Sequence, residues 1–268
     1  MKIIIFALAF LFFFSAVSAQ QRDTANTGIF YTLKHMTDTA RPSVFRQENM
    51  VLYIGPRLNI FLSLDKFKRD SLLAAGNRST SNSENRKPVT NTKIITNRPS
   101  HQLLVLEYLF RNYYYTTPYP AINWHITSDV KAIAGYSCKR AEGYYKGRMF
   151  HAWFTTETGL EGAPWKLQGL PGLVLEAYDT LKQVFFLFSK KENKIANVFA
   201  ITIPPPKAIE TTQKDFLQMR EAAFNDPVGF VNSSNPATGL QLKITPAKDN
   251  TVSLRLRKPA NPLELVDD

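Results

Sequence analysis

The sequence predicts a mainly β protein: a β-rich α+β domain built on a curved antiparallel meander sheet with one or two packed helices. Short segments rich in aromatic and β-branched residues follow one another along the chain, bounded by Gly, Pro and Asn, which is typical of antiparallel strands. Long helical patterns do not alternate with them, which argues against a βαβ fold. The composition is 44% hydrophobic and 12% aromatic, which is enough to bury a core and excludes wholesale disorder.

Residues 1–19 have the pattern of an export signal. A lysine supplies a short positive region, residues 3–14 are apolar, and Val17 and Ala19 occupy the −3 and −1 positions before Gln20. The apolar run is shorter than the roughly 20 residues that a membrane-spanning helix needs, so we expect cleavage and no transmembrane segment in the mature form. The expected location is the periplasm, the outer-membrane surface or the medium.

The first part of the mature chain predicts strands. Apolar and polar residues alternate at residues 27–36, as in a half-buried strand. Residues 50–54 and 58–64 follow on either side of Gly55 and Pro56. The two segments therefore predict a hairpin.

The periodicity changes after this hairpin. Residues 65–75 predict a short helix, with Asp65 as its N-cap and Gly76 just past its end. Residues 76–93 contain no aromatic residue and are dense in Asn, Ser, Thr, Arg and Lys. We expect them to form an exposed, mobile loop within a single domain of residues 20–268.

Strand patterns then dominate the rest of the chain. After the proline run at residues 204–206, Thr212 and Asp215 predict the start of a helix that ends near residue 224. The strands predicted before and after this helix are residues 102–108, 111–115, 122–126, 135–145, 148–156, 172–179, 183–189, 240–244 and 252–256.

The charge balance is basic, with 33 Lys and Arg against 22 Asp and Glu and a net charge of +11. Export removes nucleic acid as an expected partner. The basic residues are mostly scattered along the chain, which favours a solvated surface over a dedicated patch. If a patch exists, anionic lipid headgroups, lipopolysaccharide or acidic glycans are the targets that an exported protein meets.

Cys138 is the only cysteine, so an internal disulfide is excluded. We expect it to be buried in a strand. A catalytic thiol would need a histidine base beside it, and the four histidines form no recognisable arrangement around it; they are His35, His101, His125 and His151. A reactive nucleophile or an intermolecular bridge is the alternative.

No motif for a metal, a cofactor or a nucleophilic serine is present. The sequence contains no HExxH, His-x-His or paired cysteines, no Gly-x-Ser-x-Gly and no glycine-rich phosphate loop. A glycosidase would need two carboxylates about 5 to 9.5 Å apart in one cleft. The central candidates for such a pair are Glu157, Glu161, Glu176 and Asp179.

Three ordered blocks stand apart from generic strand composition, at residues 135–141, 147–155 and 164–174. The last contains Gly-Leu-Pro-Gly-Leu-Val, from Gly169 to Val174. The blocks resemble the GLPGLI family of exported proteins from Bacteroidota, with Val174 in place of the final Ile, and residues 261–265 resemble the usual ending of that family. The resemblance implies a cell-envelope location, an antiparallel β-rich domain and no established activity, so it carries over no catalytic residue.

The signature itself can be interpreted physically. Proline presets φ near −65° and glycine accepts positive φ, so Leu170-Pro171-Gly172-Leu173 predicts a type II turn. We interpret Gly169, Leu170, Pro171, Gly172, Leu173 and Val174 as a structural corner of the fold. The alternative is a ligand-binding rim made by Arg148, Trp153 and Trp165.

The leading functional hypothesis from these observations is a non-enzymatic binding or accessory protein of the periplasm or outer membrane. Its curved sheet would present an apolar concavity to an outer-membrane protein, a lipid, a peptide or a glycan. No cofactor is expected. The alternative is a hydrolase that acts on envelope glycans or peptides with two of the four carboxylates.

Overall fold

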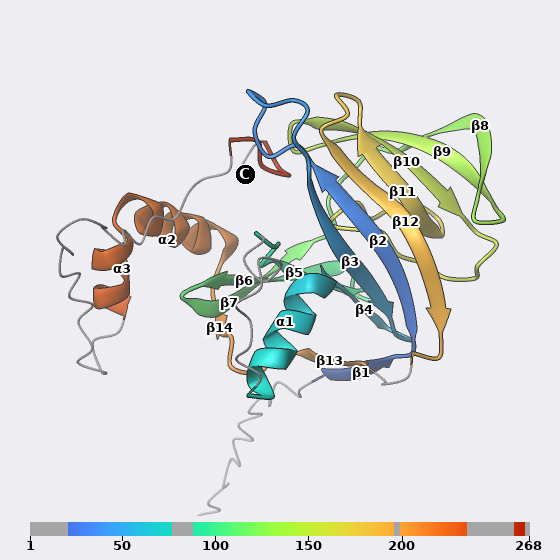
Figure 1. The fold of residues 1–268 in the computed structure, drawn as a ribbon. Helices are drawn as coiled ribbons and strands as arrows, with labels where there is room; N and C mark the ends of the chain where they lie inside the picture. The colour runs from blue at the N-terminus through green and yellow to red at the C-terminus, as the bar shows by residue number, and fades with distance from the viewer. Residues whose placement is uncertain (1–20, 77–87, 196–198, 235–259, 266–268) are drawn as a thin grey trace, which may run out of the picture.

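A computed structural model describes residues 21–76, 88–195, 199–234 and 260–265. Its main element is a 12-stranded sheet in the order β14-β7-β6-β5-β4-β3-β2-β12-β11-β10-β9-β8 (Figure 1), in which only β14 pairs in parallel with its neighbour. The strands of this sheet are β2 (Thr27–His35), β3 (Arg46–Ile54), β4 (Leu58–Ser63), β5 (Lys93–Asn97), β6 (Gln102–Leu109), β7 (Arg111–Pro118), β8 (His125–Ile133), β9 (Tyr136–Tyr145), β10 (Arg148–Thr155), β11 (Leu173–Asp179), β12 (Val184–Asn193) and β14 (Ile209–Glu210).

A second, two-stranded sheet pairs β1 (Gln21–Ala25) with β13 (Phe199–Ile203). Three helices complete the described part of the chain: α1 (Leu64–Ala74), α2 (Gln213–Asn225) and α3 (Pro227–Ser234). The mainly β fold class predicted from the sequence is therefore confirmed, with helices packed beside a largely antiparallel sheet.

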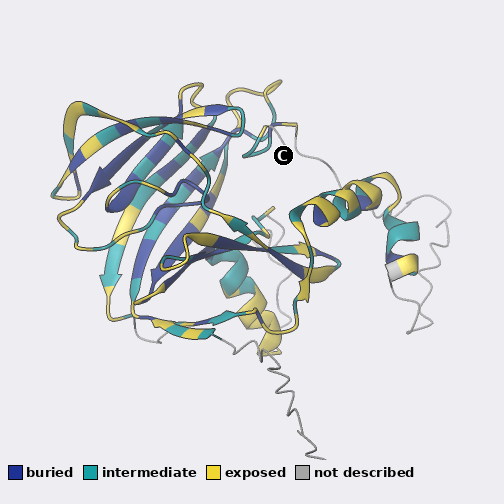
Figure 2. Ribbon diagram, turned by 180° about the vertical axis from the view of Figure 1, so that it is seen from behind, coloured by how far each residue is buried: buried dark blue, intermediate teal, exposed yellow. Residues whose placement is uncertain are grey.

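The large sheet curls, so that strands far apart in its order face one another. Leu103 of β6 and Tyr145 of β9 line the same cavity, although seven strands separate β6 from β9 in the order of the sheet. The inner face holds the larger core, which includes Tyr31, Phe150 and Phe186. Because strand side chains alternate between faces, burial also alternates along many strands (Figure 2).

The outer face is covered over part of its width by a second core. Val51, Leu62 and Ile95 project from β3, β4 and β5 into this core, where they meet Ile201 of β13. Phe67 of α1 also packs against it. The small sheet and α1 thus cover the outer side of the central strands and leave β9, β10 and β11 outside this second core.

Both predicted helices are present, with one difference in capping. Helix α1 begins one residue earlier than expected, because the Ser63 hydroxyl accepts a hydrogen bond from Lys66 N at 3.0 Å and acts as the N-cap. Asp65 is not the cap and instead accepts hydrogen bonds from Asn49. The Thr212 cap of α2 is confirmed, with Asp215 N donating to its hydroxyl at 3.1 Å.

Other boundaries differ from the predictions. Strand β8 starts at His125 rather than at residue 122 and continues to Ile133. Strands β1, β5, β13 and β14 and helix α3 were not predicted. Of the expected loop at residues 76–93, the described residues 88–92 are attached to the sheet, because Thr90 N and its hydroxyl both donate to the Glu48 carboxylate.

Some predictions lie outside the described residues, namely the export signal at residues 1–19 and the strands at 240–244 and 252–256. The single-domain prediction for residues 20–268 also stays a prediction. Among the helices of the described ranges, none is long and apolar enough to cross a membrane.

Candidate functional site

The long loop of residues 156–172 lies against the inner face of the curled sheet. The Asn59 side chain on β4 donates from Nδ2 to the carbonyl oxygen of Glu161 at 3.0 Å. Where the loop ends, the Tyr31 hydroxyl of β2 donates to the carbonyl oxygen of Val174 at 2.7 Å. These contacts join residues more than a hundred positions apart, so long-range hydrogen bonds hold the loop against the sheet.

The predicted corner at Pro171 is present, but it is tighter than a type II turn. Gly172 N donates to the carbonyl oxygen of Leu170 at 3.0 Å, which closes a three-residue turn around Pro171. Gly172 has φ of 131°, so the positive φ predicted for it is confirmed. A Cβ atom on Gly172 would lie 2.3 Å from the carbonyl oxygen of Thr155, so close approach of two backbones also requires glycine here.

A half-open cavity of about 350 Å³ lies beside this loop. Its polar lining includes Arg98, His101 and Glu161, and its aromatic lining is Tyr119. The Tyr119 ring contacts the His101 ring edge-on with 5.3 Å between centroids, and Tyr119 N donates to the carbonyl oxygen of His101 at 2.9 Å. We call this the Tyr119 cavity.

Three charged or ionisable groups of the Tyr119 cavity influence one another. Burial raises the pKa of the Tyr119 hydroxyl, Arg98 opposes the rise and Glu161 adds to it. The hydroxyl therefore stays protonated at neutral pH and can donate a hydrogen bond. An aromatic ring flanked by a guanidinium and a carboxylate can stack on a sugar ring while binding its hydroxyls.

Asn59 closes the floor of the Tyr119 cavity. The side chain is 1% exposed, and its Oδ1 has no hydrogen-bond partner among the described residues. An acceptor of this kind is costly to leave unpaired when buried. It is available to a donor that enters the cavity, such as a hydroxyl group.

A second cavity of about 380 Å³ is also lined by Tyr119. Lys166 and Glu264 line it and form an ion pair, with Nζ and Oε1 2.8 Å apart. Half-buried Glu107 lies on β6 close enough to feel both charges, and burial raises the pKa of its carboxyl group. Thr92 Oγ1 donates to Glu107 at 2.9 Å, which favours the charged form and opposes this rise.

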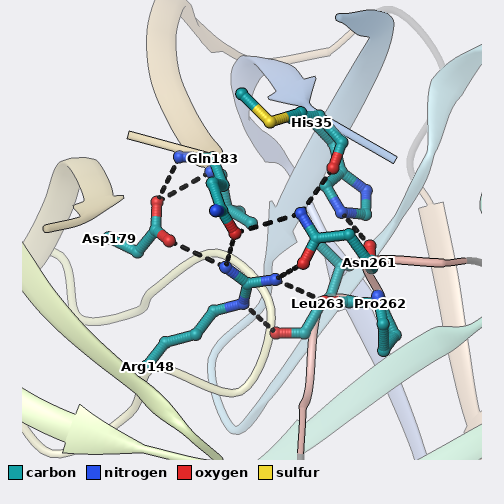
Figure 3. Close-up of polar contacts among 9 residues, drawn as sticks. His35, Arg148, Asp179, Gln183, Asn261, Pro262 and Leu263 are labelled. Atoms are coloured by element: carbon teal, nitrogen blue, oxygen red, sulfur yellow. Dashed lines mark hydrogen bonds and ion pairs between the residues drawn. The ribbon is translucent and has the colours of Figure 1, made fainter. Parts of the chain in front are cut away.

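Arg148 lies in a buried polar cluster and not on a surface (Figure 3). Its Nη1 donates to Asp179 Oδ2 at 2.7 Å and to Gln183 Oε1 at 3.1 Å. The remaining donors bind the C-terminal segment of residues 260–265, at Asn261 Oδ1 and at the carbonyl oxygens of residues 262 and 263. All five guanidinium N–H groups therefore have acceptors inside the protein.

The two tryptophans of the predicted ligand rim have polar partners other than Arg148. Trp153 is 8% exposed and has the Lys131 ammonium over its ring at 4.5 Å. Trp165 is 8% exposed, and its Nε1 donates to Glu264 Oε1 at 3.0 Å. On β10, Trp153 follows Arg148 by five positions, an odd number, so alternation places the two side chains on opposite faces of the strand. A ligand-binding role for these three residues stays a prediction.

The structure does not gather the four carboxylates into one cleft. Asp179 is bound to Arg148 inside the protein, whereas Glu176 is paired with Lys131. Glu157 accepts a hydrogen bond from Ser137 N. Only Glu161 among the four lines one of the two cavities.

Metal and thiol chemistry also have no assembled site in the described ranges. No group of three or more His, Cys, Asp or Glu residues among them could hold a metal ion. Cys138 is fully buried, as predicted, and burial raises the pKa of its thiol to about 11. Tyr119 and Arg98 were not identified from the sequence. The one local signal for this region is the tyrosine-rich run of residues 113–119, whose last tyrosine stands between two prolines.

Comparison with known proteins gives the relationships of the chain. The family model described as "N-glycanase peptide, N-terminal domain" matches residues 77–210. No curated protein matches. Two solved structures of PNGF-II, in the P21 and C2 space groups, resemble the fold with TM-scores of 0.54 and 0.53, each at 12% identity over 75% of this chain. The chain spans about a third of their length, 34% and 33% respectively.

These findings correct two expectations from the sequence. The resemblance to the GLPGLI family is wrong as an assignment, because the family model that matches is a different one. The hypothesis of a non-enzymatic binding or accessory protein is overturned as well, since the matching family is named for a glycan-acting enzyme. The glycan-acting alternative agrees better with the match. With half of its residues covered by that model, the chain belongs to the N-terminal domain family of peptide N-glycanases.

Proposed function

We propose that this chain takes part in the hydrolysis of N-linked glycans and that the Tyr119 cavity holds a sugar of the glycoprotein or glycopeptide substrate. The observation that carries the proposal is the position of the cavity. Every residue that lines it except Asn59 lies within residues 77–210, the stretch matched by the N-glycanase family. The family relationship and the polar-aromatic cavity thus fall on the same part of the chain.

The chemistry of the lining supports a sugar as ligand. The carboxylate of Glu161 can accept hydrogen bonds from two neighbouring hydroxyls, and the guanidinium of Arg98 can donate to ring or hydroxyl oxygens. Asn59 Oδ1 supplies one more acceptor at the floor. Tyr119 offers an aromatic surface for the apolar face of a sugar.

Glu161 is the group in this cavity best suited to move a proton. Two hydrogen bonds anchor the backbone around this residue. Asn59 donates to the carbonyl oxygen of Glu161, and Val174 N donates to the carbonyl oxygen of Gly162 at 2.9 Å. An anchored carboxylate can orient a water molecule or a substrate amide by hydrogen bonding. The Tyr119 hydroxyl, held protonated, is a donor on the same cavity wall.

The experiment compares a peptide carrying one high-mannose N-glycan with the same peptide lacking the glycan. Calorimetry measures binding, and mass spectrometry follows release of the glycan from the peptide. We expect binding of the glycopeptide alone and a loss of at least about tenfold in affinity for Glu161→Gln and for Tyr119→Leu. Glu157→Gln is the matched control, because Glu157 is an exposed carboxylate of the same loop outside the cavity.

Two results would refute the proposal. Equal binding of both peptides would show that the glycan is not recognised. Full affinity in both cavity variants, with folding verified by circular dichroism, would show that the Tyr119 cavity is not the site.

Export remains part of the proposal. It is supported by the composition of residues 1–19, and secreted or envelope-facing compartments are where an exported domain would meet glycoproteins. Cell fractionation followed by N-terminal sequencing tests it. A mature form that starts at Gln20 supports export, and a cytoplasmic protein that retains residue 1 contradicts it.

A further inference from the structure

A continuous row of side chains crosses the outer face of the curled sheet. In the register of the strands, Lys34 of β2 lies opposite Phe185 of β12, Phe185 opposite Tyr178 of β11, and Tyr178 opposite His151 of β10. At least one neighbour of each along its strand belongs to the inner core, so alternation directs these four side chains outward. Adjacent strands lie about 4.8 Å apart, so the row extends for roughly 14 Å across the sheet.

The rings of this row contact one another. The centroids of His151 and Tyr178 are 5.5 Å apart, and those of Tyr178 and Phe185 are 6.1 Å apart. Phe45, just before β3, adds a fourth ring at 6.1 Å from Phe185. All four rings are half-buried, so each keeps part of its surface in water.

Two lysines place positive charge over these rings. The Lys34 ammonium lies 5.1 Å from the Phe45 centroid and 5.6 Å from that of Phe185, and the Lys182 ammonium lies 3.5 Å from that of Tyr178. Within the described ranges neither lysine forms an ion pair with a carboxylate. Other cations nearby are neutralised, for example Lys131 by Glu176.

The covering elements of the outer face lie elsewhere. Helix α1 packs on β3 and β4, and the small sheet packs on β4. The second core, which marks the covered part, contains no residue of β10 or β11. The part of the outer face with the aromatic row is therefore the part that these elements leave accessible.

We propose that the aromatic row formed by Lys34, Phe45, Phe185, Tyr178, Lys182 and His151 binds an anionic polysaccharide, independently of the Tyr119 cavity. Flat rings in line can stack on the apolar faces of consecutive sugars. The ammonium groups can pair with carboxylate or sulfate groups carried by the same chain. Lysine has a flexible four-carbon stem, so each ammonium can leave its ring when a sugar takes its place.

Charge complementarity selects this ligand among those that meet an exposed sheet face. A neutral glycan would leave both ammonium groups unpaired, and an apolar partner would have to desolvate them. The protein as a whole carries a net charge of +11, which adds long-range attraction for polyanions. A linear polyanion with sugar rings satisfies the rings and the cations together.

The test measures binding of the purified chain to heparin, which is sulfated, to polygalacturonate, which carries carboxylates, and to neutral dextran. We expect calorimetric binding of one or both polyanions, weakened by added salt, and none of dextran. The double variant Lys34→Gln/Lys182→Gln and the variant Tyr178→Leu should each lose at least about tenfold in affinity. The control is Lys68→Gln/Lys214→Gln, which removes the same charge from exposed positions on α1 and α2, and should retain binding.

Each other outcome overturns the proposal. Equal loss in the control variant would mean that net charge alone attracts polyanions. Full binding by the Lys34/Lys182 and Tyr178 variants would place the contact elsewhere. Absence of polyanion binding would refute the proposal. Binding of anionic lipid vesicles through the same residues, without any polysaccharide binding, would assign the row a lipid partner. Glycopeptide binding at the Tyr119 cavity should be unchanged in all these variants, so the two proposals fail separately.

Discussion

Arg148 and Asp179 form an ion pair inside the protein, with 2.7 Å between Nη1 and Oδ2 and side-chain exposures of 0% and 1%. Asp179 Oδ1 also accepts from the backbone N–H groups of Gln183 and Val184. Burial of two charges is tolerated here because every hydrogen-bonding position of the guanidinium and several of the carboxylate are used. The pair therefore holds the ends of β10, β11 and β12 and the C-terminal segment in one place.

Removing one charge of this pair should strongly destabilise the protein. In Asp179→Asn the buried guanidinium loses its counterion, and we expect a loss on the order of 3 to 5 kcal/mol in the free energy of unfolding. Urea denaturation measures it. Asp70→Asn breaks the exposed Lys66–Asp70 pair of α1 and should change stability by no more than about 0.5 kcal/mol. Similar effects of the two substitutions would contradict the role of the buried pair.

Gly172 should resist replacement more strongly than another glycine with positive φ. Gly135 has φ of 87° and open space where a Cβ would lie, whereas the Cβ of residue 172 would meet the Thr155 carbonyl. Valine at either position adds backbone strain of about 1 to 3 kcal/mol, but only Gly172→Val adds the clash. Thermal melting should show the larger decrease in Tm for Gly172→Val, and equal decreases would argue against the close approach.

Cys138 should be unreactive in the folded protein. Burial raises the pKa of its thiol to about 11, so little thiolate exists at pH 8. Labelling with a thiol reagent at that pH should be slow until denaturant is added. The control variant Ser137→Cys/Cys138→Ala places the only thiol at an exposed position of the same strand and should react at once. Rapid labelling of the native wild-type protein would show that the thiol is accessible.

Stability should fall in mildly acidic solution because of His35. Burial lowers the pKa of His35 to about 4, with further lowering by Arg46 and a smaller opposing effect from its contact with Asn261. Between pH 6.5 and pH 4 the unfolded chain binds a proton at this residue and the folded chain does not, so stability decreases as pH falls through this window. The change should be on the order of 2 to 3 kcal/mol.

Urea denaturation from pH 7 to pH 4 measures this effect. The variant His35→Gln removes the titrating group and should show a flatter dependence on pH across this window. The variant His101→Asn changes an exposed histidine and should keep the wild-type dependence. A wild-type slope in His35→Gln would assign the acid sensitivity to other groups.

Local patterns predicted those parts of the fold that depend on neighbouring residues. The Thr212 cap, the alternation of β2 and the burial of Cys138 were all recognisable from short stretches of sequence. Strand β5 was missed because the polar stretch before it dominated the composition, although Ile94 and Ile95 are buried in the middle of the sheet. The polar residues at both ends of this strand form hydrogen bonds with side chains of other strands. A local sequence pattern does not reveal such long-range partners.

The candidate sites depend on distant parts of the chain, and this limited their prediction. The Tyr119 cavity combines residues from the end of β7, the segment after β5 and the loop before β11. Arg148 was noticed in the sequence as a ligand-binding candidate, but its acceptors lie 31 to 115 residues further along the chain. The glycan-related family was likewise missed, because the Gly-Leu-Pro-Gly motif marks a tight backbone turn that other β-rich proteins can share.

The attachment of residues 260–265 to Arg148 also has a consequence for the order of folding. Asn261 follows Arg148 by 113 residues, so during synthesis β10 and β11 exist long before their last partner. Until then the guanidinium has Asp179 but lacks three of its acceptors, and the polar interior stays accessible to water. Completion of the cluster is a late, long-range event, of the kind that slows folding because a large loop must close first. A nascent chain that reaches only β12 should therefore remain more sensitive to proteases than the finished protein.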